Sequence, residues 1–309
     1  MAFQEVLRST LILPVNVPRF VEKACERGAD AVMLDLEDAV PAGEKDRARR
    51  LVAPSLAQAG RGGGQVLVRV NNDPELLEAD LEASIHPGLD CLVLPKAESL
   101  DQVAAVDEQI TRLEKARGLM PGGVGLSLIV ETPLGLMNLR EIASASPRIQ
   151  VLSAGAEDYC LELGVEPSPE GTEVFVLLAL VVAAAKARGL KPVGQLGSVA
   201  GFKDLAGFER AALGARRLGC EGGLAIHPHQ VPVLNRVFSP DPEKVAEARR
   251  VTAAFEAGLE QGTASVSLNG RMVDRPGYVR ALRLVQRAQA IARLEERKTQ
   301  AAARLAETA

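Results

Sequence analysis

Short apolar runs alternate with longer amphipathic stretches through most of the 309-residue chain. Each run is rich in Val, Ile and Leu and is apolar on both faces, which is typical of a strand buried inside a parallel sheet. A helix-like segment follows each run, so the pattern predicts a series of β-α units. The predicted strands occupy residues 9–14, 31–37, 65–71, 91–96, 125–131, 151–158, 191–197 and 222–228.

The number of these units indicates the fold. About eight β-α units within roughly 230 residues are typical of a TIM (β/α)8 barrel. An open doubly wound sheet is the alternative. It is weakened because "LPVNVPRF" stands after the first strand, where a glycine-rich phosphate loop would be expected. We therefore predict an α/β protein in which residues 1–238 form a TIM barrel that carries the active site.

The pattern changes after Phe238. A helix capped by Ser239 or Asp241 is followed by an alternating stretch with an Asn-Gly turn signal, and a last amphipathic helix begins at about Pro276. We expect residues 239–309 to form a C-terminal extension, made of a helix, a loop that carries Asp274 and a final helix, which is used in oligomer assembly.

Composition excludes several classes of protein. The net charge is −4, whereas a general nucleic-acid binder is normally basic, so we expect no nucleic-acid partner. The four cysteines form no CxxC pair, which favours reduced thiols over a disulfide frame or a zinc site. No signal peptide is recognisable, and the longest apolar run is well short of the roughly 20 residues that span a bilayer. We expect a cytoplasmic protein with no membrane partner.

Charged residues stand at the predicted carboxyl ends of the strands, where the active sites of TIM barrels lie. One such residue alone would be read as a solvated strand end or a barrel-mouth ion pair. Several acids that follow uninterrupted apolar strands favour a shared site instead. The set comprises the "DLED" run with Asp35, Glu37 and Asp38, then Arg69 with the neighbouring Asn71, Lys96, Glu131, Glu157, Asp158 and His227.

Glu131 and Asp158 are the central pair, because they end neighbouring predicted strands. Two close carboxylates in a dry pocket repel each other, so one takes up a proton unless a cation lies between them. Mg²⁺ would keep both ionised and would retain waters that substrate oxygens displace. A paired general acid and base is the competing interpretation. The absence of a His/Cys cluster in the sequence argues against zinc.

Several segments, in order along nearly the whole chain, resemble the citrate lyase β-subunit-like branch of the HpcH/HpaI aldolase family. They include "NVPRFVEKACERGADAVMLDLEDAV", "LVLPKAES", "IVETPLGLMNLREIA", "LSAGAEDYCLELG", "GGLAIHPHQVPVLNRVFSP" and "GRMVDRP". The resemblance implies a TIM barrel, with Mg²⁺ (Mn²⁺ as an alternative) held by Glu131 and Asp158. It also implies an acyl-CoA or acyl-carrier thioester and a 2-oxo acid as substrates, and a homo-oligomer, often a trimer, with C-terminal segments exchanged between subunits.

The resemblance extends to other positions. Arg19 and Lys45 resemble positions that approach the phosphates of CoA or the carrier, although an ordinary solvated helix face is the alternative. The loop around Leu224 and Ala225 resembles the place where backbone groups meet the pantetheine arm. Asp274 matches an aspartate that acts in the neighbouring subunit's site as a proton donor or acceptor. From position alone, Asp274 would be read as a solvated loop residue or a helix cap.

The chemistry of such a lyase suits the remaining charged side chains. Arg69 would stabilise a thioester enolate or clamp a carboxylate, because its planar fork suits either ligand. It could also pair with Glu37 or Asp38, which we expect to orient it or the metal waters. Lys96 suggests a Schiff-base mechanism as an alternative, but we favour an ion pair for it.

The sequence therefore predicts a carbon–carbon lyase of the malyl-CoA or citramalyl-CoA type. A malyl-CoA thioesterase on the same scaffold is one alternative. A β subunit of a citrate lyase complex, acting with an acyl-carrier protein, is another. The sequence reads "PVN" at 14–16 where many relatives read "PGN". This difference lies beside the expected CoA path, so the resemblance does not identify the substrate.

Overall fold

The computed structural model describes residues 6–307. They form two compact units. One contains the chain up to Phe238 together with residues from Gln300 onward, and the other is Ser239–Thr299.

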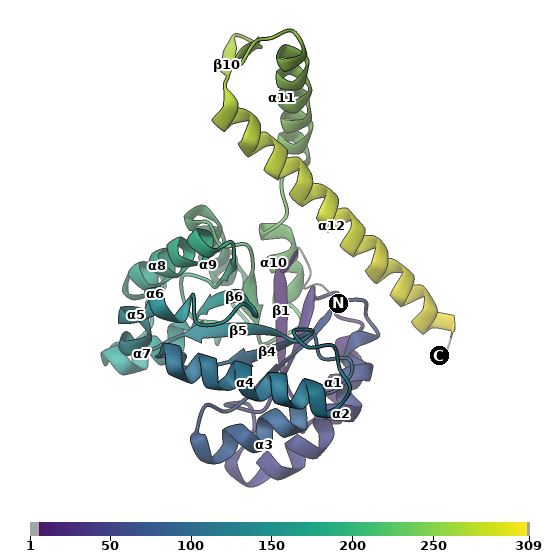
Figure 1. Ribbon diagram of the computed structural model, residues 1–309, viewed down its shortest axis with the longest axis vertical. Coiled ribbons are helices and arrows are strands. Elements are labelled where there is room, and N and C mark those ends of the chain that lie inside the picture. Colours follow the sequence, from purple (N-terminus) through teal and green to yellow (C-terminus); the bar gives the residue numbers. More distant parts are fainter. Residues whose placement is uncertain (1–5, 308–309) are drawn as a thin grey trace. The chain divides into compact units, whose positions relative to one another are not determined.

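Eight parallel strands form the sheet of the first unit (Figure 1), in the order β7-β6-β5-β4-β3-β2-β1-β8. Strand β8 pairs with β1, and a bridge between Val193 and Gly222 joins the β7 and β8 segments. The ring is therefore nearly closed, which confirms the TIM-barrel prediction over the open sheet. The strands are β1 Ser9–Pro14, β2 Ala31–Asp35, β3 Gln65–Arg69, β4 Cys91–Leu94, β5 Gly125–Val130, β6 Ile149–Ala154, β7 Lys191–Val193 and β8 Gly223–Ala225.

Helices surround this ring on its outside (Figure 1). Between the sheet and the helices lies a large core of aliphatic side chains, each of which contributes about 1.5–3 kcal/mol when fully buried. The helices are α1 Pro18–Ala24, the short 3₁₀ turn η1 Ala42–Glu44, α2 Lys45–Gly60, α3 Pro74–Ser84, α4 Leu100–Ala116, α5 Pro133–Met137, α6 Leu139–Ile142, α7 Ala156–Leu163, α8 Thr172–Arg188, α9 Leu205–Leu218 and α10 Gln230–Val237.

A second, smaller core fills the inside of the ring. It is built from one or two inward-facing residues of most strands, among them Met33, Leu67, Val93, Ile129 and Val151. Because side chains on a strand alternate between its two faces, the residue two positions further along also points inward. The barrel interior is thus plugged with apolar side chains, and the next inward position belongs to the mouth.

Every strand after the first ends earlier than the sequence pattern predicts. The largest differences that bear on the site are at β2, which ends at Asp35 and not at residue 37, and at β6, which ends at Ala154 and not at residue 158. Asp158 therefore does not end a strand, because Gly155 interrupts the run and Asp158 falls in the first turn of α7. A carboxylate is favoured there by the partial positive charge of a helix N-terminus.

The second unit contains a helix, a hairpin and the start of the final helix. Helix α11 Pro242–Glu260 is capped by Asp241, whose side chain accepts a hydrogen bond from the Glu243 N–H at 2.9 Å. Strands β9 Val266–Leu268 and β10 Arg271–Val273 are joined at Asn269 and Gly270, which both have positive φ as a tight hairpin turn requires. Helix α12 spans Arg275–Glu307. No helix within residues 6–307 is both long and apolar enough to cross a membrane.

Candidate active site

Strand alternation carries three charged side chains into the mouth of the barrel. Asp35 lies two residues after Met33, Arg69 two after Leu67, and Glu131 two after Ile129. The three residues before them belong to the inner core, so each charged side chain continues the inward face of its strand.

Arg69 is held by Asp35 from the adjacent strand. Its Nε and Nη2 donate to the two carboxylate oxygens, each at 2.7 Å. Its Nη1 lies 2.8 Å from Glu37 Oε2 and 3.5 Å from Asp38 Oδ2. Burial alone lowers the pKa of Arg69, but the hydrogen bonds and charges of the acids outweigh it and raise the pKa. Arg69 therefore stays charged at any ordinary pH.

Glu37 is a buried acid with unused hydrogen-bonding capacity. Its side chain is 9% exposed, and its Oε2 accepts no hydrogen bond within the described residues, despite the nearby Arg69. Burial raises the pKa of Glu37 to about 7, against the opposing charge of Arg69. Glu37 Oε2 is thus held by the charge of Arg69 and can still accept a hydrogen bond from a water or a substrate.

Glu131 is buried beneath the mouth. Its Oε1 accepts a hydrogen bond from the backbone N–H of Lys96 at 2.9 Å. Burial raises the pKa of Glu131 to about 8, and the charges of Asp158 and Glu37 add to the effect. Gly155 makes room for it, because a Cβ on residue 155 would stand 2.6 Å from the Glu131 Cβ.

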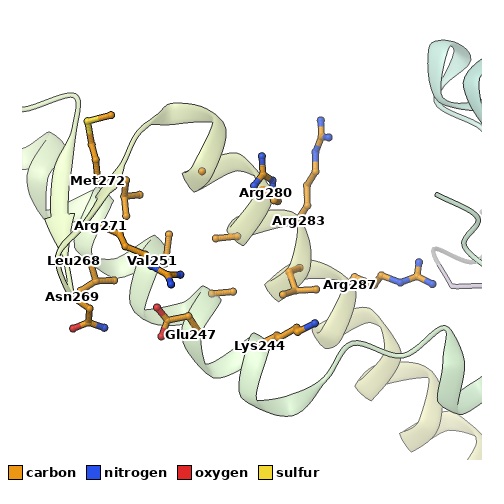
Figure 2. A pocket seen from close by; sticks show the side chains of 15 residues that line it. Lys244, Glu247, Val251, Leu268, Asn269, Arg271, Met272, Arg280, Arg283 and Arg287 are labelled. Atoms are coloured by element: carbon orange, nitrogen blue, oxygen red, sulfur yellow. The ribbon is translucent and has the colours of Figure 1, made fainter. Parts of the chain in front are cut away.

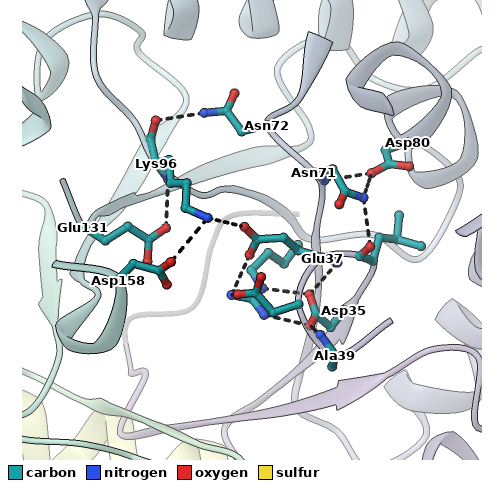
Figure 3. Close-up of polar contacts among 12 residues, drawn as sticks. Asp35, Glu37, Ala39, Asn71, Asn72, Asp80, Lys96, Glu131 and Asp158 are labelled. Carbon is teal, nitrogen blue, oxygen red and sulfur yellow. Dashed lines mark hydrogen bonds and ion pairs between the residues drawn. The ribbon is translucent and has the colours of Figure 1, made fainter. Parts of the chain in front are cut away.

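Lys96 lies between the acids. Its Nζ is 3.3 Å from Glu37 Oε1 and 3.4 Å from Asp158 Oδ1. Figure 3 shows Lys96 between these two acids. Its φ of +48° is unusual for a residue other than glycine. The Asn72 amide donates to its carbonyl at 2.8 Å and helps to hold this conformation. The expected ion pair is present, with Glu37 and Asp158 as its partners.

The charges and donor atoms of this site fit a divalent cation. Asp35, Glu37, Glu131 and Asp158 face Arg69 and Lys96, which leaves a formal charge of −2 when all are ionised. No group of three or more His, Cys, Asp or Glu residues in the described chain is arranged to hold a metal. Glu131 and Asp158 could thus supply only part of a coordination shell, which suits Mg²⁺, because this ion is commonly bound by one or two carboxylates together with water and substrate.

Two members of this site have no role assigned from the sequence. Asp35 belongs to the "DLED" strand end, but its pairing with Arg69 follows from the β2–β3 register, which the structure provides. Gly155 was read only as part of an apolar strand. Its role depends on the packing of β6 against β5, and no pattern within its own segment reports that.

Of the residues assigned to CoA binding, Arg19 lines a pocket and Lys45 turns inward. The pocket, of about 430 Å³, lies between β1, α1 and the loop at 226–228, and Lys23 and Arg27 also line it. Lys45 Nζ instead donates to the carbonyls of Leu36 and Glu37 at 2.7 and 2.8 Å, and to Asn71 at 2.8 Å. In this arrangement Lys45 supports the backbone that carries Glu37.

Leu224 and Ala225 lie on β8. Both backbone groups of Leu224 bind the Gln195 side chain, its N–H donating to Oε1 at 3.0 Å and its carbonyl accepting from Nε2 at 2.9 Å. Ala225 is fully buried. The neighbouring His227 stacks on Phe202, with ring centroids 5.0 Å apart.

Asp274 lies in the second unit and is exposed. Its Oδ1 accepts a hydrogen bond from the Gly277 N–H at 2.9 Å, so within this chain it acts as a cap at the start of α12.

The second unit also contains a groove of about 810 Å³ between α11, α12 and the β9–β10 hairpin (Figure 2). Apolar side chains such as Val251 and Leu268 line it together with basic ones. The acid among its lining residues, Glu247, is paired with Arg250. The basic lining residues are Lys244, Arg271, Arg280, Arg283 and Arg287.

Comparison with known proteins gives consistent matches. The family model described as HpcH/HpaI aldolase/citrate lyase matches residues 8–228. The citrate lyase subunit beta of Escherichia coli (strain K12) is 39% identical over 283 residues, which cover 91% of this chain and 93% of that protein. The L-malyl-CoA/beta-methylmalyl-CoA lyase of Rhodobacter capsulatus is 33% identical and covers 91% and 94%. The (3S)-malyl-CoA thioesterase of Cereibacter sphaeroides is 36% identical and covers 92% and 95%.

Solved structures are similar as well. Protein CitE from Mycobacterium tuberculosis, in complex with magnesium, acetoacetate and coenzyme A, is 28% identical with a TM-score of 0.71, and the match covers 93% of this chain and all of that one. A citrate lyase from Burkholderia xenovorans has a TM-score of 0.79 at 22% identity, covering 94% and 93%, and supports the fold alone.

Proposed function

Since this chain belongs to the HpcH/HpaI aldolase/citrate lyase family, we propose that it is a Mg²⁺-dependent carbon–carbon lyase. It would split a 3-hydroxyacyl-CoA such as malyl-CoA or citramalyl-CoA into an acyl-CoA and a 2-oxo acid, or join them. The observation that carries this proposal is the convergence of Glu131, Asp158 and Arg69 on one barrel mouth, with a charge balance that calls for a divalent cation.

Glu131 and Asp158 would hold Mg²⁺, which supplies Lewis-acid polarisation of substrate oxygens when bound. Arg69 would bind the substrate's carboxylate or the enolate oxygen. Two of its nitrogens donate to Asp35, whereas Nη1 is ion-paired with Glu37 and Asp38, so Nη1 is the group that a substrate carboxylate or enolate oxygen would share with these acids. Donors fixed in advance stabilise developing negative charge most effectively, because they need not reorganise during the reaction.

The thioester end of the substrate would lie along the pocket lined by Arg19, Lys23 and Arg27. These three cations recur at four-residue intervals along and just beyond α1, so the first two share a helix face. Such a row suits the phosphates of CoA. In support, one similar solved protein was captured with coenzyme A and magnesium.

Thioester hydrolysis is the second candidate. It is favoured by Glu37, a buried acid with a pKa of about 7 whose Oε2 accepts no hydrogen bond from the described residues, which is suited to take a proton from an attacking water. One similar protein is a malyl-CoA thioesterase. A third candidate, a β subunit that acts on a carrier-bound thioester, is supported by the similarity to citrate lyase subunit beta.

The C-terminal unit would assemble the protein into a homo-oligomer. Residues 239–299 contain eleven Lys and Arg against eight Asp and Glu, which gives this segment a net charge of +3. Because the whole chain has a net charge of −4, the other residues together carry −7. Opposite charges on the two parts favour contact between copies. Light scattering of Arg280→Glu against the parent protein tests this role, and an unchanged mass would contradict it for the groove.

The reaction is tested by incubating purified protein with Mg²⁺ and a panel of hydroxyacyl-CoAs, followed by mass spectrometry. Lyase activity yields acetyl-CoA or propionyl-CoA plus a 2-oxo acid, whereas hydrolysis yields free CoA and the hydroxy acid. Glu131→Gln is the matched control. Inactivity of the isolated protein with every CoA ester, together with activity on a carrier-bound thioester, would instead support the citrate lyase role.

A further inference from the structure

Lys96 contacts both of the proposed metal ligands, through two different groups. Its backbone N–H donates to Glu131 Oε1 at 2.9 Å, and its ammonium lies 3.4 Å from Asp158 Oδ1. The same ammonium lies 3.3 Å from Glu37 Oε1 (Figure 3). Lys96 is thus placed where a bound cation would share Asp158 with it.

The two ends of Lys96 differ in freedom. The backbone is fixed in a left-handed conformation by Glu131 on one side and by the Asn72 amide on the other, at 2.9 and 2.8 Å. The side chain is 37% exposed, and its contacts of 3.3 and 3.4 Å are longer than those of a tight charged hydrogen bond. The ammonium can therefore move away from Asp158 while the backbone keeps its hold on Glu131.

A divalent ion bound to Asp158 would repel an ammonium that touches the same carboxylate. Glu37 already contacts the ammonium through Oε1 at 3.3 Å, while its Oε2 faces Arg69, so Oε1 remains a partner for Lys96 after Asp158 is given up. An exchange is therefore available in which the ammonium gives up Asp158 and keeps Glu37. The loss of the Lys96–Asp158 ion pair therefore reduces the net free energy of metal binding.

We propose that the Lys96 ammonium competes with the metal for Asp158. It neutralises Asp158 and Glu37 in the metal-free protein, and it releases Asp158 when the divalent ion binds. This inference rests on the proposed metal site of Glu131 and Asp158. In this role Lys96 is a positioning residue that sets the affinity for the metal. Loss of its charge would strengthen metal binding, whereas loss of a residue that only supports the site would weaken it.

The test is Mn²⁺ binding, measured by electron paramagnetic resonance and by calorimetry on the full chain. Lys96→Met removes the rival charge and leaves the backbone N–H in place, so we expect it to bind Mn²⁺ roughly tenfold more tightly than the parent protein. Lys96→Arg, which keeps the charge, should stay near the parent value. Lys115→Met is the matched control, because this exposed lysine ends α4 on the opposite face of the barrel.

Unchanged or weaker Mn²⁺ binding by Lys96→Met would overturn the inference while leaving the metal site intact. Mn²⁺ binding that survives in Glu131→Ala would overturn the metal site itself, and the inference with it. Thermal unfolding gives a second readout: Lys96→Met should be less stable than the parent protein without metal and should gain more from added Mn²⁺. If Lys96→Met does not fold, Lys96→Gln provides the same comparison.

Discussion

Asp35 and Arg69 stand directly opposite each other on strands β2 and β3, and two parallel hydrogen bonds of 2.7 Å join them. The Asp35 side chain is fully buried, and that of Arg69 is 11% exposed. Asp35 also accepts hydrogen bonds from the backbone N–H groups of Glu37 and Ala39, at 3.0 Å each. One carboxylate therefore aims the guanidinium and shapes the loop that carries Glu37.

Replacement of Arg69 by lysine should reduce kcat/KM by roughly 100-fold or more, because lysine keeps the charge but cannot bind Asp35 with two parallel hydrogen bonds and still offer a third donor. Steady-state kinetics and thermal unfolding on the same preparation separate the two effects. If Arg69 is only a structural partner of the acids, the lysine variant will keep most of its activity.

Glu131→Ala and Asp158→Ala should each lose metal affinity and lower turnover by more than roughly 100-fold, since each removes a proposed ligand. Both variants should stay folded, because their side chains lie at the mouth and not in the aliphatic core. Activity of the parent protein should also vanish with EDTA and return with Mg²⁺. Full activity of either variant in chelated buffer would sink the assignment.

Gly155→Ala should displace Glu131, because the new Cβ would stand 2.6 Å from the Glu131 Cβ. We expect a loss of about 1–3 kcal/mol in the free energy of unfolding, as is usual for overpacking, and weaker Mg²⁺ binding. Gly43→Ala is the matched control, since nothing lies within 4 Å of the Cβ that it adds. Denaturant unfolding and calorimetry check both effects, and equal results for the two variants would contradict the packing argument.

The metal-free protein should lose stability as pH rises. Glu131 has a pKa of about 8, raised by burial and by Asp158, against an ordinary value of 4.5 that applies to the unfolded chain. Between these values the folded state holds a proton that the unfolded state has released, so the free energy of unfolding falls as pH increases through this range.

Mg²⁺ must replace that proton. It should therefore raise Tm more at pH 8.5 than at pH 6, by roughly the several degrees that about 1–2 kcal/mol represents. Thermal scans with and without Mg²⁺ at both pH values check this difference. Glu131→Gln should flatten the pH dependence, and an unaltered slope in that variant would assign it to other groups.

Asp274 should act on the active site of a neighbouring subunit. Asp274→Asn keeps a good helix cap but cannot carry a proton, whereas Asp274→Ala loses both and about 1 kcal/mol of stability. We expect both variants to be nearly inactive, and mixed oligomers of Asp274→Ala with Glu131→Ala to regain activity. If mixing restores nothing once subunit exchange is confirmed, the trans-acting role is wrong.

The strand positions were predictable because buried parallel strands leave an unbroken apolar signal. Where each strand ends was less predictable, since that depends on the neighbouring strand's hydrogen bonds. Asp158 shows this, because only the break at Gly155 moves it from a strand into a helix. Lys45 shows a second limit. A lysine on a helix is expected to be exposed, yet its ammonium binds two carbonyls of the loop that precedes its helix, which no local pattern reveals.

Strands β7 and β8 have three residues each, and backbone hydrogen bonds join their segments, from the Glu221 N–H to the Pro192 carbonyl at 2.9 Å and from the Gly194 N–H to the Gly222 carbonyl at 3.0 Å. The Gln195 side chain extends this short ladder, because its amide bonds to both backbone groups of Leu224 as a neighbouring peptide would. The last seam of the ring is thus completed by a side chain, whose torsions are softer than those of a strand. Breathing of the barrel, such as hydrogen exchange would record, should concentrate at this seam, and Gln195 is a residue through which its tightness can change without altering any strand.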